Sequence, residues 1–459
     1  MTKLFKLIKE SLSGDEQRDY TKISINKAIV LLSVPMIIEM FFEALFALVD
    51  AFFVAKYVGI EGVATVGLTE SVLTLIYSLA WGLSAAATAI IARRIGENNQ
   101  ESASKSVAQI IMVSVIIGIA IAVFGFIYST DILKLMGASE KVISDGIWYT
   151  RISFLSSPII ILLFTLSGAL RGSGSASMAM KAVIIANIIN IVLDFIFLPI
   201  MGMGVEGAAL ATLVGRSVGI CIQLWALIGD SGKVKLFLNQ FIPEKELIIN
   251  ILKVASGAAG QFLIQSASWV FLVRIISIYG SEVVAGYTIA LRIIVFTILP
   301  SWGMANSAAT LVGQNLGAKQ PARAEKSAWT ISFLNMGFLF LIMLVFFAFS
   351  EEFITFFNPD PVVIKTGSDC LKILAAGYVF FGIGMVITQA INGAGDTFTP
   401  TLFNIICFWG IEIPLAYYLA QSLDMKQNGV FWSIIIAESI LAVMAIIYFK
   451  RGRWKKFEV

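Results

Sequence analysis

Two segments of this chain share one pattern: WGLSAAATAIIARRIGENNQESASKS at residues 81–106 and WGMANSAATLVGQNLGAKQPARAEKS at residues 302–327. The two copies start 221 residues apart, at positions 81 and 302. The same offset pairs Gly59 with Gly280, and it persists over more than a hundred positions. A constant register of this length is not expected from chance similarity between apolar segments. The sequence therefore predicts two structurally similar halves.

The composition indicates a membrane protein. Of the 459 residues, 58% are hydrophobic and only 14% are charged, whereas soluble globular domains are about 25% charged. The mean hydropathy is +0.87. A water-soluble enzyme needs far more polar surface, so we expect no enzyme. The 33 Lys and Arg exceed the 30 Asp and Glu by only three charges, which is too small a surplus to indicate a nucleic-acid partner.

The chain contains no histidine. This excludes imidazole metal sites, Ser-His and Cys-His catalysis, and histidine as a pH sensor, so proton chemistry falls mainly to carboxylates. The three cysteines, Cys221, Cys370 and Cys407, lie in apolar stretches without a CxxC motif. They predict small core residues and no disulfide framework or metal site.

A transmembrane helix needs about 20 mostly apolar residues, and the sequence offers twelve such spans. Six spans per half, an even number, give both halves the same orientation around an axis along the membrane normal. The predicted fold is therefore an all-α membrane protein with two pseudo-symmetric six-helix bundles around a central cavity. The spans lie near 26–56, 63–92, 107–128, 147–169, 178–201, 206–229, 247–279, 283–314, 328–349, 368–392, 398–421 and 428–449.

These spans predict five regions along the chain. Residues 1–25 form a cytoplasmic N-terminal arm, 26–229 the N-lobe, 230–246 a cytoplasmic linker, 247–449 the C-lobe, and 450–459 a basic cytoplasmic tail. In the arm, four apolar residues predict either a short interfacial helix or a disordered tail. They are Leu4, Phe5, Leu7 and Ile8.

Positive charges predict the orientation, since cytoplasmic loops carry an excess of Lys and Arg. Most of the 33 Lys and Arg fall in segments on the same side as the N-terminus, including the tail KRGRWKK. We therefore expect both termini in the cytoplasm and a multi-pass location in the inner or plasma membrane. The opposite loops hold only Lys56, Lys134, Lys141, Lys365 and Lys426.

Polar groups inside the first and fifth spans are the strongest functional signal, because such groups are costly and usually face a cavity or a partner. In the first span, Glu39, Glu43 and Asp50 are separated by 4, 7 and 11 residues, which places them within roughly 40° of one helix face at about 100° per residue. The fifth span also carries three polar groups on one face: Asn187, Asn190 and Asp194.

Asp50 and Asp194 both fall in the outer halves of their spans, so we expect them to face each other in the N-lobe. Two carboxylates buried together repel each other and resist full ionisation, which suits a reversible proton carrier. Asn190 and Thr212 add an amide and a hydroxyl, and the four groups supply hard oxygen ligands for sodium. The predicted coupling ion is H⁺ or Na⁺, with no organic cofactor. Helix–helix hydrogen bonding explains Glu39, Glu43 or Asn187 equally well.

The second half lacks this set of groups. By the 221-residue offset, its counterparts of Asp50, Asn190 and Asp194 are the apolar residues Phe271, Ile411 and Leu415.

The second half has two intramembrane acids of its own, Glu412 and Glu438. Each is explained at least as well by an ion pair with a nearby Arg as by a carrier role. Other polar and aromatic residues there are candidates for a substrate cavity, although interface packing explains them equally well. They are Gln261, Gln265, Trp269, Trp302 and Gln389.

Prolines inside the spans predict kinks or weakened helices, because proline removes a backbone donor. They are Pro35, Pro158, Pro300 and Pro414. The glycines at 172–174 and 393–395 predict turns at equivalent ends of the two repeats, and no GK[ST] follows them to indicate a nucleotide.

Nearly the whole chain resembles one family, the multidrug and toxic compound extrusion (MATE) transporters. The similarity rests on the twelve spans in two halves and on LVGQNLGAKQPARAEKSA (311–328) with its counterpart IARRIGENNQESASKSV (91–107). The turns ALRGSGSA (169–176) and AINGAGDTFTP (390–400), and LVDAFFV (48–54) in the first span, resemble signatures of the same family.

The resemblance implies two bundles around a V-shaped cavity that export cationic or amphipathic drugs in exchange for protons or sodium. It implies that Asp50 is the first-span aspartate and that Asn190, Asp194 and Thr212 complete its cation site, with Pro35 bending the first span. The stretch GQFLIQSASW (260–269) lacks the acid found in NorM-like members, so the chain is similar to the DinF-like branch with coupling in the N-lobe.

Two alternatives stay open at this point. A lipid-linked oligosaccharide flippase of the same superfamily shares the span plan but usually has a strongly basic cavity, and a membrane-embedded enzyme or receptor belongs to a different class. For the transporter we expect lipophilic or cationic small molecules and the lipid bilayer as partners, and a monomer.

Overall fold

The computed structural model describes residues 2–14, 18–229 and 232–457, and every regular element in these ranges is a helix. The ends of the arm, linker and tail predictions at 1, 15–17, 230–231 and 458–459 lie outside the described residues. The first half consists of α1 Thr2–Ser13, α2 Ile25–Tyr57, α3 Ile60–Gly96, α4 Gln100–Leu135, α5 Glu140–Leu155, α6 Ser157–Ser173, α7 Ala176–Phe195, the π-helix η1 Ile196–Ile200, and α8 Val205–Ile228.

The second half follows a short 3₁₀ turn, η2 Leu238–Phe241, in the linker. It consists of α9 Lys245–Ile276, η3 Ser277–Tyr279, α10 Ser281–Gly317, α11 Pro321–Phe357, α12 Pro361–Ala376, α13 Tyr378–Gly393, α14 Phe398–Asn404, η4 Ile405–Glu412, α15 Ile413–Tyr417, η5 Tyr418–Ser422, α16 Lys426–Lys450 and η6 Arg453–Lys456.

The helix boundaries repeat with the predicted offset of 221 residues. Both ends of α3 map onto both ends of α10. The glycines that precede these helices, Gly59 and Gly280, both have positive φ (87° and 112°), and so do Gly174 and Gly395 in the predicted turns (95° and 97°). Positive φ carries no steric penalty in glycine, so the two halves share the same turns as well as the same helices. The predicted repeat is confirmed.

The spans agree with the prediction in number but not in detail. Within the described residues, ten helices are long and apolar enough to cross a membrane, and two bent pairs raise the number to twelve if each pair is one span. The predicted continuous spans 147–169 and 368–392 are wrong in this respect. The first is bent by 40° between α5 and α6 and the second by 57° between α12 and α13. The 221-residue offset places one break, at Ser156, on the other, at Gly377.

The prolines act differently from one another. α2 and α10 are each continuous through Pro35 and Pro300, so neither proline ends its helix. Pro158 and Pro414 lie in the first turns of α6 and α15. At Pro158, which begins a new helix after the Ser156 break, the missing N–H has no intrahelical partner to lose. Pro414 instead lies inside the continuous helical span Phe398–Ser422, directly after the π-helix η4.

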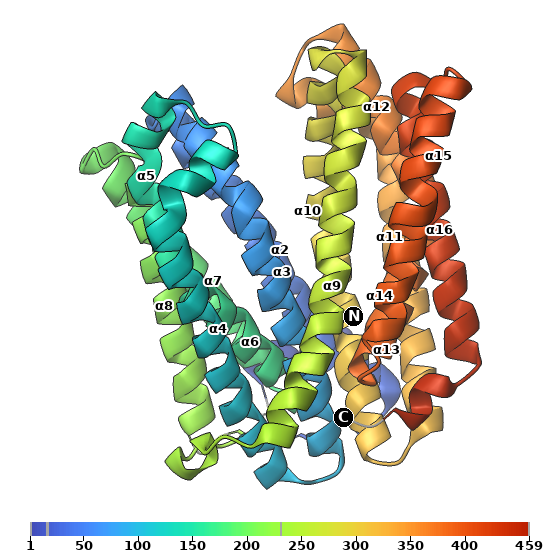
Figure 1. Ribbon diagram of the computed structural model, residues 1–459. Helices are drawn as coiled ribbons and strands as arrows, with labels where there is room; N and C mark the ends of the chain where they lie inside the picture. Colours follow the sequence, from blue (N-terminus) through green and yellow to red (C-terminus); the bar gives the residue numbers. More distant parts are fainter. Residues whose placement is uncertain (1, 15–17, 230–231, 458–459) are drawn as a thin grey trace.

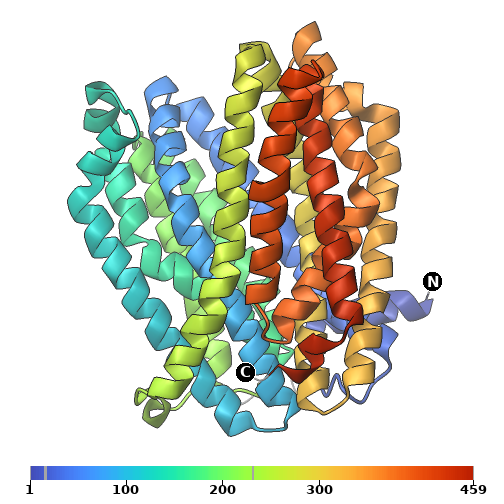
Figure 2. The same ribbon diagram turned by 45° about the vertical axis from the view of Figure 1, so that its right-hand side comes forward.

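The two halves form two bundles that touch at one end and diverge toward the other (Figure 1). They touch where α3 and α10 end, on the side where the N-terminal arm and the tail pack; we call this the terminus side. The first membrane-spanning helix of each half, α2 or α9, crosses to the other half. α2 packs against α10, and the lower end of α9 packs against α3 (Figures 1 and 2). The contact between the lobes is therefore made mainly by four helices.

Small residues allow this close contact between the lobes, as is typical of transmembrane helix packing. A Cβ atom at Gly96 would lie 2.0 Å from the carbonyl oxygen of Gln314, and one at Gly317 would lie 2.1 Å from that of Arg93. Gly303 contacts α2 in the same way, since its Cβ would lie 2.4 Å from the Met36 oxygen. The lobes are thus packed backbone to backbone on the terminus side.

The Gly303→Ala variant is expected to be less stable than the wild type. The added methyl group overlaps the α2 backbone, and overpacking of this kind typically costs roughly 1–3 kcal/mol. The matched control is Gly337→Ala in α11, where a Cβ atom meets no other heavy atom within 4 Å. The apparent melting temperature of the purified protein measures the effect. Equal melting temperatures for the two variants would contradict the packing described here.

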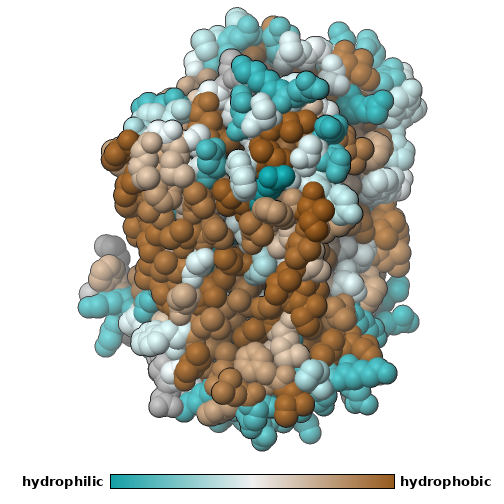
Figure 3. Space-filling model, turned by 60° about the vertical axis from the view of Figure 1, so that its left-hand side comes forward, coloured by the Kyte–Doolittle hydropathy of each residue, from teal (hydrophilic) through white to brown (hydrophobic). Residues whose placement is uncertain are grey.

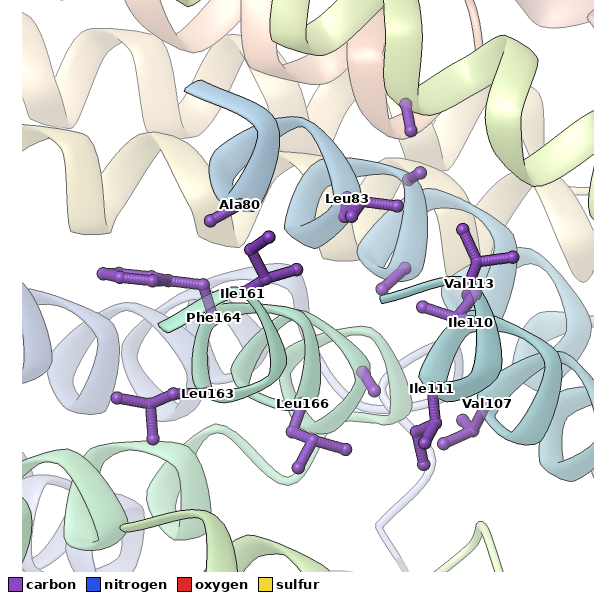
Figure 4. Close-up of a cluster of buried hydrophobic side chains, with 14 of the residues drawn as sticks. Ala80, Leu83, Val107, Ile110, Ile111, Val113, Ile161, Leu163, Phe164 and Leu166 are labelled. Carbon is purple, nitrogen blue, oxygen red and sulfur yellow. The ribbon is translucent and has the colours of Figure 1, made fainter. Parts of the chain in front are cut away.

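A broad apolar band covers the face shown in Figure 3, with hydrophilic residues gathered above and below it. Large side chains such as Ile116, Ile127 and Leu341 are more than half exposed. Exposed apolar area of this extent fits a lipid environment. Inside the N-lobe, one buried cluster joins α3, α4 and α6 (Figure 4). Its members include Ala80, Leu83, Val107, Ile110, Ile111, Val113, Ile161, Leu163, Phe164 and Leu166.

Both ends of the chain bridge the two lobes on the terminus side. The arm contains the helix α1, and its predicted alternative, a disordered tail, is wrong for Thr2–Ser13, although the Leu4 side chain lies outside the described residues. Behind α1, the Tyr20 hydroxyl donates to the Gly174 oxygen (3.1 Å) in the N-lobe, and Arg323 of the C-lobe donates to the Tyr20 oxygen (3.0 Å).

The tail makes a second bridge. Trp454 is fully buried and stacks on Phe449 with the ring centres 4.4 Å apart. Lys455 forms an ion pair with Glu325 of the C-lobe (2.6 Å), and Arg93 of the N-lobe donates to the Phe457 oxygen (3.0 Å). The tail therefore holds positions in both lobes.

Candidate functional site

A small cavity of about 50 Å³ lies inside the N-lobe. It is formed where α5 ends at the Ser156 break, and α2, α3 and α8 supply its other walls. The lining residues are Phe46, Asp50, Glu70, Leu73, Tyr77, Tyr149, Ser153, Ser156, Ile160, Ala209 and Thr212. Two of the predicted site residues, Asp50 and Thr212, thus share one cavity.

The other two predicted residues lie beside this cavity on α7. Asn190 and Asp194 are both buried, and the Asn190 amide nitrogen is 3.3 Å from the Thr212 hydroxyl oxygen. Asp194 lies in the last turn of α7, directly before the π-helix η1. The Asp50 and Asp194 carboxylates are close enough for their charges to repel each other. The structure therefore places all four predicted residues in one cluster.

The oxygens of this cluster lack hydrogen-bond donors. Among the residues that the structure describes, Asp50 Oδ1, Asn190 Oδ1 and both Asp194 oxygens are buried without a hydrogen-bond partner. Buried polar atoms are nearly always paired, and exceptions mark functional positions or a missing ion. Carboxylate, amide and hydroxyl oxygens are hard ligands. The donor set thus fits Na⁺, and either carboxylate can instead hold a proton.

Glu70 of α3 is a site residue that the sequence reasoning missed. It lines the same cavity as Asp50, and the two carboxylates repel each other. The positive charge that acts on Glu70 is Arg292, which belongs to α10 of the other lobe. A signal was present in the sequence, since Glu70 is an acid inside the predicted span 63–92.

Two of the predicted supporting residues have structural partners. Glu39 is buried and forms an ion pair with Arg171 of α6 (2.7 Å), which also donates to Ser84 (2.8 Å). Arg171 therefore belongs to a buried network inside the lobe and is not one of the exposed loop residues whose positive charge predicts the orientation. Asn187 donates to the Phe42 backbone oxygen (3.0 Å) and joins α7 to α2. For both residues the structural interpretation fits.

Glu43 is associated with the second buried arginine of the N-lobe. The Glu43 carboxylate lies within reach of the Arg216 charge. The Arg216 guanidinium lies over three aromatic rings, Phe46, Tyr77 and Phe164, at 5.2–5.6 Å from the ring centres. Such cation–π contacts stabilise a desolvated arginine. Pro35, the remaining supporting residue, lies in α2 on the terminus-side half, away from this cluster.

A larger cavity of about 270 Å³ lies in the C-lobe and reaches the lobe contact. Of the predicted cavity residues, Gln265, Trp269 and Trp302 line it. Gln261 and Gln389 line an adjoining cavity of about 60 Å³. The sequence reasoning missed several lining residues that come from five different helices: Trp81, Phe262, Tyr287, Tyr378, Phe381 and Glu438.

Neither acid of the C-lobe forms the ion pair with arginine that we considered from the sequence. Within the described ranges, Glu412 and Glu438 take part in no salt bridge. Glu412 is buried with Oε1 unpaired, and Glu438 lines the same two cavities as Gln265. The arginine interpretation is therefore wrong for both residues.

Comparisons with known proteins give one consistent result. The chain is 24% identical to "Probable multidrug resistance protein YoeA" of Bacillus subtilis (strain 168) over 449 residues, 96% of each protein. It is also 24% identical to "Multidrug export protein MepA" of Staphylococcus aureus (strain N315), over 96% of this chain and 97% of that protein. A solved structure described as the outward-facing conformation of a multidrug resistance MATE family transporter superposes with a TM-score of 0.90. It is 27% identical and covers 95% of this chain and 98% of that chain.

The family model is matched twice, once in each lobe. The MatE model covers residues 35–196 and again residues 258–418, well over half of the chain. The two matches reproduce the repeat seen in the sequence and in the helix boundaries. The chain belongs to the MatE family of efflux transporters.

Proposed function

We propose that this protein is a secondary active antiporter that exports lipophilic or cationic drugs in exchange for protons or sodium. The relatives named as multidrug export and resistance proteins support the drug substrates. The observation that carries the coupling proposal is the N-lobe cluster, where the buried oxygens of Asp50, Asn190 and Asp194 have no hydrogen-bond donor among the described residues. In this lobe, as in the DinF-like branch, coupling rests on carboxylates.

The coupling step is a change of charge in the N-lobe. When Asp50 or Asp194 takes up a proton or the cluster binds Na⁺, the repulsion between the two carboxylates falls. When the ion leaves, the repulsion returns and a negative charge is again uncompensated. A ligand shifts a conformational equilibrium only by its different affinity for the two states. The ion therefore drives transport if the outward-open and inward-open states differ in how they separate these two groups.

The orientation follows from charge. We infer that the terminus side faces the cytoplasm of a plasma-membrane protein, because most Lys and Arg lie on that side. The lobes are packed together there and diverge on the other side (Figure 1), which corresponds to an outward-open state. Alternating access then requires the glycine contacts between α3 and α10 to separate.

Efflux from proteoliposomes tests this proposal. We expect purified protein to expel a fluorescent cation such as ethidium when an inward proton gradient or an inward sodium gradient is imposed separately. One of the two gradients should raise the efflux rate, and a protonophore or a sodium ionophore should abolish the increase. An efflux rate that neither gradient changes would contradict antiport. A complete lack of efflux would favour a membrane enzyme or receptor.

The cavity chemistry favours an organic cation over a lipid-linked pyrophosphate. A pyrophosphate needs several Lys or Arg side chains as ligands. No residue that lines the C-lobe cavity is basic. Arg171 lines a smaller cavity at the lobe contact, but Glu39 already neutralises it. Accumulation of lipid-linked oligosaccharide in a deletion strain would instead support the flippase alternative.

A further inference from the structure

The C-lobe cavity contains a single acidic side chain within aromatic walls. Glu438 extends from α16 into both the 270 Å³ cavity and the adjoining 60 Å³ cavity. The walls around it are largely apolar and aromatic, and no lining residue is basic. The cavity lies next to the break at Gly377, which corresponds by the repeat to the N-lobe break beside Asp50.

The break at Gly377 shapes this cavity. A Cβ atom there would lie 2.9 Å from the Ile435 side chain, so glycine lets α12 and α13 bend close to α16 without displacing Ile435. Tyr378 and Phe381, which directly follow the break, line the cavity opposite Trp269 and Trp302. The bend at Gly377 therefore helps to shape this cavity.

Among the residues that the structure describes, Glu438 has no counterion. Gln265 lines the same two cavities as Glu438, and Glu412 and the Cys407 thiol lie within electrostatic reach of it. Glu412 keeps one buried carboxylate oxygen without a donor among the described residues. Glu438 is half-buried in a largely apolar cavity, where a carboxylate without a positive partner is unfavourable, so it is stabilised by either a proton or a cation from outside.

The aromatic walls of the cavity determine which kind of cation it binds. Phe262 and Trp302 lie 5.5 Å apart, and Trp81 of the N-lobe lies 5.7 Å from Phe262 and 6.4 Å from Trp302. Faces of such rings attract organic cations, and the attraction grows when the cation is desolvated. A small hydrated metal ion gains little from these walls. The chemistry of the site therefore fits a cation with its own apolar surface.

We propose that Glu438 is the charge-selecting residue of a binding site for lipophilic organic cations in the C-lobe, separate from the coupling cluster in the N-lobe. The inference extends the proposed export function by giving its substrate a location. The sizes of the two cavities agree with this division. Ligand pockets usually begin at roughly 300 Å³. The C-lobe cavity, at about 270 Å³, approaches this size, whereas the N-lobe cavity, at about 50 Å³, suits only a small ion.

The position of Trp81 links binding to the movement of the lobes. Trp81 belongs to α3 of the N-lobe, yet it lines the C-lobe cavity. A cation in this cavity contacts both lobes, and its contacts change when the lobes separate on the terminus side. The indoles of Trp81, Trp269 and Trp302 also make intrinsic fluorescence a direct reporter of occupancy.

Equilibrium binding of two probes tests the inference without any ion gradient. Tetraphenylphosphonium and tetraphenylborate have nearly the same shape and opposite charge. We expect the purified protein to quench its tryptophan fluorescence on binding tetraphenylphosphonium and to bind tetraphenylborate much more weakly. Glu438→Gln should weaken tetraphenylphosphonium binding by at least about tenfold and narrow the difference in affinity between the two probes, because the negative charge in the cavity is removed.

Two further variants serve as controls. Glu438→Asp keeps the charge and should retain binding within about threefold, which separates loss of charge from loss of fold. Asp131→Asn removes an exposed aspartate on α4 that lines neither cavity and should leave tetraphenylphosphonium affinity unchanged. Monodisperse elution of each variant confirms that it is folded.

Several outcomes would overturn the inference. They are wild-type affinity in Glu438→Gln, equal binding of both probes by the wild type, no binding of either probe, or a loss of binding in Asp131→Asn as large as in Glu438→Gln. The proposed antiport is judged separately, by gradient-driven efflux. Charge-selective binding that depends on Glu438, without coupled efflux, would support the inference and refute antiport. Coupled efflux together with wild-type binding affinity in Glu438→Gln would support antiport and refute the inference.

Discussion

Asp50→Asn is expected to abolish gradient-driven efflux, with a fall of at least about tenfold toward the rate of empty liposomes. The amide can neither release a proton nor carry the charge that holds Na⁺ beside Asp194. The variant should still fold, because Asp50 Oδ1 has no hydrogen-bond donor among the described residues that the substitution would remove. Ethidium efflux from proteoliposomes under imposed gradients measures the effect.

Asp194→Asn should act in the same direction, since Asp194 is the second carboxylate of the cluster. The matched control is Asp131→Asn on α4, an exposed aspartate outside the N-lobe cavity. Its efflux should equal that of the wild type. Normal coupled efflux in Asp50→Asn would show that the coupling site lies elsewhere in the protein.

Arg171→Met is expected to cause the largest loss of stability, roughly 3–5 kcal/mol, because it leaves the buried Glu39 carboxylate without its counterion. The pair joins α6 to α2 with an N–O distance of 2.7 Å, and both side chains are at most 4% exposed. The apparent melting temperature should fall sharply. The expression level of folded protein should fall with it.

The double variant Arg171→Met/Glu39→Met should recover much of this loss, since apolar side chains often replace a buried ion pair at little cost. As a matched control, Lys455→Met breaks an ion pair with Glu325 in which both side chains are about 30% exposed. Pairs of this kind contribute about 1 kcal/mol or less. A double variant as unstable as Arg171→Met alone would contradict this account.

Much of the fold was predictable because both the turn residues and the apolar spans recur at the same 221-residue offset. Gly59 and Gly280 stand at equivalent helix starts, and the structure gives both a positive φ. The breaks at Ser156 and Gly377 were not predicted. Each break lies between two apolar stretches, so counting apolar residues predicts one span where the structure has two helices.

The N-lobe site was predictable because charged and amide groups are rare inside apolar spans, and helical spacing shows which of them share a face. Asp50, Asn190 and Asp194 were found in this way, and Glu70 could have been. The partners of these groups were not predictable. Whether a buried acid such as Glu39 meets an arginine, or one such as Glu438 meets none, depends on how distant helices pack.

The C-lobe cavity shows the same limit. Its walls also include Trp81 from the first half and Phe262 and Phe381 from the second half, none of which was predicted. Nothing in the local sequence around these residues distinguishes them from aromatic residues that face lipid. Their convergence follows from the crossing of α9 and α3 and from the bend at Gly377.

The bridges made by the two chain ends have a practical consequence for anyone who purifies this transporter. Arg93 holds the Phe457 backbone and Arg323 holds the Tyr20 backbone, so each end ties one lobe to the other on the terminus side. If the lobes alternate as proposed, these ties are released and remade in every cycle. A purification tag fused to either end then lies beside contacts that change during the transport cycle. Turnover numbers are therefore comparable only between preparations from which the tag has been removed.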